Sequence, residues 1–141
     1  MQKATARWTG EKVAFEVESG TGHQATVDES ATNFGNDEGM RPTEMLLGAL
    51  GACTGINAVL LLKKFKQPYQ SLAVEVEGDQ LEDWPHAFTQ IRITFVIGWT
   101  AKFEKELVDR ALDMAVNRYC PVDATLARGT KIEFKRRDHK V

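Results

Sequence analysis

Polar and apolar residues alternate in short stretches near both ends of the chain. The alternation over residues 4–8, 13–18 and 23–28 is typical of half-buried strands. Turn-forming residues with glycine separate these stretches, so we predict a three-stranded meander at the N-terminus. The same alternation predicts three later strands, at residues 72–80, 86–99 and 130–136.

The centre of the chain has a helical pattern instead. Residues 42–65 begin with a proline and a glutamate, are apolar in the middle and end with lysines, which suits the dipole of a helix. No charge occurs between Met45 and Leu62, so a membrane span must be considered. The several glycines of this run and the lack of a second span favour a helix buried on every side, packed against another helix or a partner subunit. An amphipathic helix is predicted over residues 102–119.

The predicted order is strands, buried helix, strands, helix and strand, which indicates the α+β class. A length of 141 residues suits one domain, and we expect a single domain over residues 1–141. The hydrophobic fraction of 43% and the charged fraction of 27% argue against a disordered or fibrous protein.

The charge balance bears on possible partners. Eighteen Lys+Arg and 20 Asp+Glu give a net charge of -2, so the chain has no net basic field for a nucleic acid. The basic stretch at residues 135–140 is too short to change this view. The N-terminal residues lack the pattern of a signal peptide, and we expect a cytoplasmic protein that binds neither nucleic acid nor membrane.

Two cysteines are too few for a secreted disulfide scaffold or a four-thiolate zinc site. Cys53 lies in the middle of the apolar helix, where a small buried hydrophobe is the alternative interpretation. Cys120 stands 67 residues later, where Pro121 disfavours helical geometry and marks a helix break. The two thiols can cycle between dithiol and disulfide if their Cα atoms approach within roughly 7 Å.

Two segments around these cysteines resemble a known family. The segments RPTEMLLGALGACTG and YCPVDATLARG are similar to the two cysteine motifs of the OsmC/Ohr family of thiol-dependent hydroperoxide reductases. The order of elements is similar over nearly the whole chain, and SGTGHQATVD resembles a less characterised OsmC-like branch. The resemblance implies antiparallel sheets wrapped around a long buried central helix, in an intertwined homodimer with active sites at the subunit interface.

The resemblance also implies a reaction. The cysteine that matches Cys53 attacks the O–O bond of a hydroperoxide as a thiolate and becomes a sulfenic acid. The residue that matches Cys120 condenses with it to a disulfide, which an external dithiol or lipoyl-type reductant reduces. No metal or other bound cofactor is expected.

A buried thiol needs a nearby cation or donor to ionise. In well-known members of the family an early-loop arginine and a glutamate directly after the motif proline provide this. Here Thr43 follows the proline, Glu44 comes one residue later and Lys12 occupies the early loop. Arg41 is the substitute cation that we consider, with Glu44 as its carboxylate; a solvated loop charge is the alternative. The candidate site therefore comprises the catalytic residues Cys53, Cys120, Glu44 and Arg41 and the substrate-binding residues Thr43, Lys12 and His23.

Three functions remain open from the sequence. The first is a thiol-dependent peroxidase for organic hydroperoxides and hydrogen peroxide. The second, favoured by the departures at Thr43 and Lys12, is an OsmC-like protein that binds a small ligand with little turnover. The third is a structural dimer whose thiols are inert core residues.

Overall fold

The computed structural model describes residues 1–141, which divide into two compact units, Met1–Leu46 and Leu47–Val141. The expectation of one domain over the whole chain stays a prediction.

The N-terminal unit is built on the predicted meander. Strands β1 (Ala4–Trp8), β2 (Phe15–Ser19) and β3 (Gln24–Val27) form an antiparallel sheet in the order β1-β2-β3. Gly10 has a φ of 89° in the turn between β1 and β2, a backbone conformation that favours glycine. A single 3-10 turn, η1 (Ala31–Asn33), interrupts the long loop that follows β3.

That loop is organised around the carboxylate of Asp28, which is only 1% exposed. Asp28 accepts backbone N–H bonds from Glu29, Asn36 and Glu38 at 2.7, 3.0 and 3.2 Å. Burial alone would raise the pKa of this carboxyl, but the three hydrogen bonds and the nearby Arg41 outweigh it and lower the pKa. The loop is therefore closed by one side chain.

Helix α1 (Pro42–Lys64) agrees with the helix predicted over residues 42–65. Its first turn is capped from within, because the backbone N–H of Arg41 donates to Oε2 of Glu44 at 2.9 Å. This is half of a capping box, in which the third helical residue reaches back to the N-cap. Two lysines occupy the last turn, where the helix dipole favours positive charge.

The second unit contains a three-stranded sheet in the order β4-β5-β6. Strands β4 (Tyr69–Gln80) and β5 (Phe88–Trp99) are antiparallel, as predicted. Strand β6 (Lys131–Lys140) runs parallel to β5, so the expectation of purely antiparallel sheets is wrong for this pair. The reason is the long connection between them, since a helical crossover returns the chain to the end of the sheet from which β5 starts.

The crossover has three helical parts. They are α2 (Lys105–Asp113), a π-helical turn η2 (Met114–Arg118) and a short α3 (Pro121–Leu126). The first two occupy most of the predicted helix of residues 102–119. π-helical turns are rare and occur often at functional sites.

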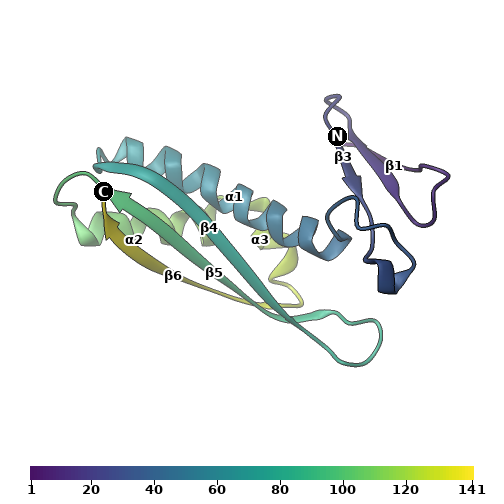
Figure 1. The fold of residues 1–141 in the computed structure, drawn as a ribbon. Helices are drawn as coiled ribbons and strands as arrows, with labels where there is room; N and C mark the ends of the chain where they lie inside the picture. Colours follow the sequence, from purple (N-terminus) through teal and green to yellow (C-terminus); the bar gives the residue numbers. More distant parts are fainter. The chain divides into compact units, whose positions relative to one another are not determined.

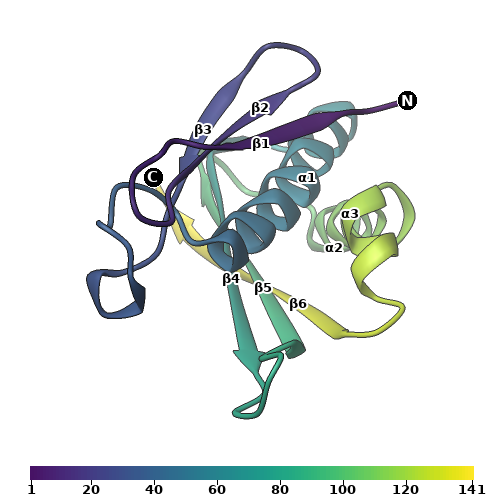
Figure 2. The same ribbon diagram turned by 90° about the vertical axis from the view of Figure 1, so that its right-hand side faces the viewer.

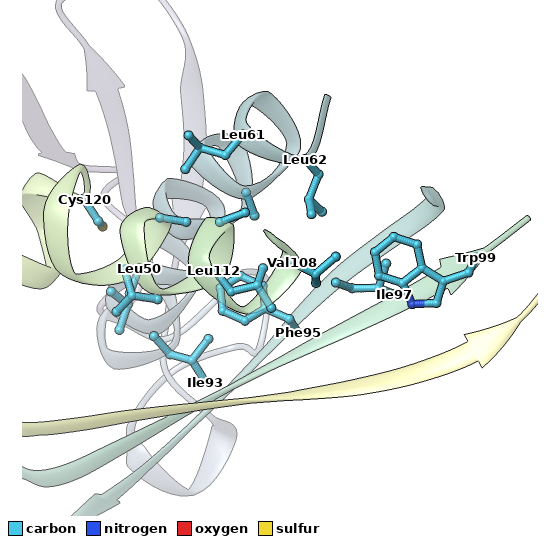
Figure 3. Close-up of a cluster of buried hydrophobic side chains, with 14 of the residues drawn as sticks. Leu50, Leu61, Leu62, Ile93, Phe95, Ile97, Trp99, Val108, Leu112 and Cys120 are labelled. Atoms are coloured by element: carbon cyan, nitrogen blue, oxygen red, sulfur yellow. The ribbon is translucent and has the colours of Figure 1, made fainter. Parts of the chain in front are cut away.

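Helices α1 and α2 cover one face of this sheet (Figures 1 and 2). Every second residue of β5 points into the core between the sheet and these two helices. Ile93, Phe95 and Ile97 have no exposed surface there (Figure 3). Gly51 and Gly55 let α1 approach β4 closely, because a Cβ at these positions would lie 3.0 and 3.2 Å from valine methyl carbons of β4.

The opposite face of α1 is open in the single chain. Seven residues of the helix are buried, but Ile56 is 62% exposed and Leu60 is 60% exposed. The expectation of a helix buried on every side is therefore not met within one chain. By length and composition alone α1 could cross a membrane, a criterion that core helices of soluble proteins also meet. A groove of about 520 Å³ runs beside it, lined by Gly51, Ala52, Gly55, Ile56, Val59, Leu60, Leu72 and Val74.

Candidate functional site

The two cysteines meet in the second unit. Cys53 is in the middle of α1 and Cys120 joins η2 to α3, so 67 residues of sequence separate them. Their Sγ atoms are 2.7 Å apart, and both are free thiols. This contact confirms that the two cysteines lie close together. A small movement of the two sulfur atoms would bring them to the S–S distance of a disulfide, about 2.05 Å.

Cys120 is the more deeply buried of the pair, at 3% exposure, whereas Cys53 is partly exposed. Burial, together with the hydrogen bond to Cys53, raises the pKa of the Cys120 thiol to about 11. The protonated Cys120 donates to the sulfur of Cys53. Cys120 is therefore a buried, protonated thiol within hydrogen-bond distance of the Cys53 sulfur.

The local backbone explains why Cys120 is held in place. It is the N-cap of α3, with an extended backbone at φ -88° and ψ 106°, and Pro121 is the first helical residue. Its sulfur accepts the backbone N–H of Asp123 at 3.2 Å. The Asp123 side chain is 7% exposed, and burial raises the pKa of its carboxyl. Pro121 at the first helical position and Asp123 in the first turn are the sequence signals of this helix start.

The charged candidates lie in the N-terminal unit, each with a partner there. The guanidinium of Arg41 donates to Asp37 at 2.5 Å and to the carbonyl of Gly39 at 3.3 Å, and the hydrogen bond to Asp37 raises its pKa. Glu44 accepts the backbone N–H of Arg41 rather than its guanidinium. The side-chain pair expected between Arg41 and Glu44 is therefore replaced by a helix cap and a loop ion pair.

The remaining candidates are also engaged locally. Lys12 has a φ of 42°, and its Nζ donates to the carbonyl of Gly35 at 3.4 Å. His23 is exposed, and its Nδ1 lies 3.1 Å from the hydroxyl of Thr21. Thr43 is exposed in the first turn of α1. No group of three or more His, Cys, Asp and Glu side chains is arranged to hold a metal.

Comparison with known proteins identifies the family. The family model described as OsmC-like protein matches residues 35–135, most of the chain and both cysteines. The chain belongs to the OsmC family. It is 31% identical over 131 residues to Protein YhfA of Escherichia coli strain K12, covering 92% of each chain.

Solved structures agree on the fold of this OsmC-family protein. A hypothetical protein from Aquifex aeolicus superposes with a TM-score of 0.84 at 22% identity, covering 100% of this chain and 98% of that one. An organic hydroperoxide resistance protein OsmC from Legionella pneumophila gives a TM-score of 0.71 at 12% identity, covering 96% of both chains. The family resemblance and the α+β OsmC fold are thus confirmed, and the family includes proteins named for hydroperoxide resistance.

Proposed function

We propose that this protein is a thiol-dependent peroxidase that reduces organic hydroperoxides, and hydrogen peroxide, through Cys53 and Cys120. The observation that carries the proposal is the contact between the two sulfurs, 2.7 Å apart, with Cys120 donating to Cys53. Membership of a family that includes hydroperoxide resistance proteins supports the same chemistry.

The reaction balances in three steps. The Cys53 thiolate attacks the outer oxygen of ROOH, the O–O bond breaks, and the alcohol ROH leaves after taking up one proton, which produces a Cys53 sulfenic acid. The Cys120 thiol then attacks that sulfur, forming the disulfide and releasing water. An external dithiol, such as a lipoyl-type reductant, restores both thiols by exchange and is itself oxidised to a disulfide.

The difference between the two cysteines supports this division of roles. Cys53 is the partly exposed thiol and is therefore the one that a peroxide reaches first. Cys120 is buried and its raised pKa keeps it protonated near neutral pH, so it is a poor first nucleophile. Once Cys53 is oxidised, Cys120 attacks the sulfenic sulfur, and the close contact of the two sulfurs supports this step.

The setting of the reaction is also part of the proposal. We propose a cytoplasmic homodimer without a bound cofactor, in which the apolar face of α1 at Ile56 and Leu60 packs against a second copy. Both side chains are more than half exposed in one chain, and no charged residue interrupts that part of the helix. Burying them would remove a large apolar surface from water.

A second function is favoured by a specific observation. Arg41 is paired with Asp37, Lys12 with a carbonyl and Glu44 with the helix start, so each charged candidate has a partner inside its own unit. If they keep these partners, none is free to activate Cys53. The protein would then bind a small apolar ligand with little turnover.

Stopped-flow mixing of the reduced protein with cumene hydroperoxide and with hydrogen peroxide separates the two functions. The peroxidase predicts rapid oxidation followed by the loss of two hydrogens per chain in the intact mass. Cys53→Ser should abolish peroxide consumption, whereas Cys120→Ser should consume one equivalent and stop at the sulfenic acid or beyond. Oxidation no faster than that of free cysteine, with unchanged mass, would exclude the peroxidase and favour ligand binding.

A further inference from the structure

A second cavity lies in the unit of residues 47–141, apart from the cysteines. It has a volume of about 720 Å³, within the range of small-molecule sites. Its walls come from the end of β5, the segment before α2 and the end of β6, and they include neither cysteine. Trp99, which lines it, and Cys120 lie at opposite ends of the hydrophobic cluster in Figure 3.

The cavity arises from a change of character along β6. On the face of β6 that packs on the core, Ile132 and Phe134 are followed at the same two-residue spacing by Arg136, Asp138 and Lys140. The inward face of the strand therefore turns from apolar to charged where it passes the start of α2. Charged side chains on such a face need partners or an opening to solvent.

One wall of the cavity is aromatic and rigid. The rings of Trp99 and Phe103 are stacked with centroids 4.2 Å apart, and the guanidinium of Arg136 lies 5.3 Å from the centroid of Phe103. The carboxylate of Asp138 fixes this arrangement. It accepts hydrogen bonds from the indole N–H of Trp99 at 2.7 Å and from the Nε–H of Arg136 at 2.8 Å. Trp99 itself is 4% exposed, so it supports Phe103 from behind, and the half-buried Phe103 and the stem of Arg136 form the accessible apolar part of this wall.

The rim is positive although the whole chain carries a net charge of -2. Among the lining side chains, four are cationic and one, Asp138, is a carboxylate. Lys105 is paired with Asp109, and Arg136 with Asp109 and Asp138. The ammonium groups of Lys102 and Lys140 form no salt bridge and are exposed at the cavity.

We propose that this cavity binds a small organic anion, with its apolar body against Phe103 and the stem of Arg136 and its carboxylate or phosphate facing Lys102 and Lys140. The proposal assigns a role to the basic stretch at residues 135–140, which the peroxidase chemistry does not use. It does not depend on the proposed reaction, because no lining residue belongs to the cysteine site.

The test uses the full reduced chain with three probes: 1-naphthoate, the neutral 1-naphthalenemethanol and inorganic phosphate. Calorimetry in 50 mM salt should give a dissociation constant for naphthoate at or below about 1 mM, the affinity ordinary for a ligand of this size. The other two probes should bind at least about fivefold more weakly. In ¹⁵N NMR spectra the indole signal of Trp99 should move, whereas those of the exposed Trp8 and Trp84 should not.

Variants then locate the anion. Lys102→Ala combined with Lys140→Ala should weaken naphthoate binding by about tenfold, because each exposed cation contributes a factor of a few. Lys135→Ala is the matched control, since Lys135 is on β6 but on the opposite face, and it should change the affinity less than twofold. Cys53→Ser should bind naphthoate like the unmodified protein.

Four results would overturn the proposal: a dissociation constant for naphthoate above about 1 mM, equal affinity for the neutral alcohol, an equal loss in the Lys135→Ala variant, or an unmoved Trp99 signal. Loss of binding in the Cys53→Ser variant would also overturn it, since the ligand would then occupy the cysteine site. All variants replace exposed lysines or one thiol, and circular dichroism checks that each is folded.

Discussion

Replacing Cys53 by alanine leaves Cys120 as the one thiol of the chain, and its environment determines how slowly it should be alkylated. A thiol with a pKa of about 11 is ionised to about one part in a thousand at pH 8, against about one part in ten for the ordinary value of 9.0. Burial, the largest cause of the raised pKa, persists in the variant, whereas the hydrogen bond to Cys53 is lost. We therefore expect alkylation between about tenfold and a hundredfold slower than that of glutathione.

The assay follows iodoacetamide addition by intact mass, with anaerobic, pre-reduced protein between pH 7 and pH 11. The rate should rise about tenfold per pH unit beyond pH 9, where the rate for glutathione levels off. Cys120→Ala is the matched variant, and its remaining Cys53 should react faster at pH 8. A rate for Cys120 that equals that of glutathione at pH 8 and levels off near pH 9 would refute the assignment of Cys120 as the protonated partner.

The same raised pKa has a consequence for stability. Between about pH 9 and pH 11 the folded chain keeps a proton on Cys120 that the unfolded chain loses, so the free energy of unfolding should fall as the pH rises through this window. Urea titrations in this range should show a smaller fall for Cys120→Ala than for the unmodified protein. An equal fall in both would show that other groups cause it.

Three further predictions concern the scaffold. Asp28→Asn should lower the melting temperature at pH 7 and reduce the loss of stability on acidification. The reason is that the lowered pKa of Asp28 stabilises the folded protein above the pKa of the unfolded state, and this contribution is lost as the pH falls through the pKa of the folded state. Melting curves from pH 2 to pH 7 test this prediction. Gly48→Ala should stabilise the protein by up to about 1 kcal/mol, because a Cβ at this position meets open space. Gly51→Ala should be less stable than Gly48→Ala, because a Cβ there would crowd a valine of β4. Urea unfolding of both variants measures the difference. Ile56→Glu with Leu60→Glu should convert the proposed dimer to a monomer in light scattering, and a monomeric unmodified protein would contradict the dimer.

Much of the fold could be predicted from local pattern. The strands and α1 follow from alternation and from the charges at the two ends of one apolar run, which are properties of neighbouring residues. The direction of β6 could not be obtained in this way, because alternation is the same for parallel and antiparallel strands. The π-helical turn was also missed, since the sequence period of a single wider turn is close to that of an α-helix.

The candidate site divides in the same manner. The meeting of Cys53 with Cys120 could be predicted because both stand in recognisable motifs. The partners of Arg41 and Lys12 could not, because Asp37 and the carbonyl of Gly35 are placed by the loop that Asp28 closes. A loop conformation set by three backbone hydrogen bonds to one carboxylate leaves no periodic signal in the sequence.

Because 67 residues separate the two cysteines in the sequence, a disulfide between them would restrict the unfolded chain. A bond between two sulfurs 67 residues apart would close a large loop in the unfolded chain, which costs that state conformational freedom equivalent to about 4 kcal/mol. Oxidation would therefore make the folded protein harder to melt. By the same thermodynamic cycle, folding would make such a disulfide harder to reduce than one in a loose peptide, and by the same free energy, so a reductant would work against this difference as well as the chemistry of one bond.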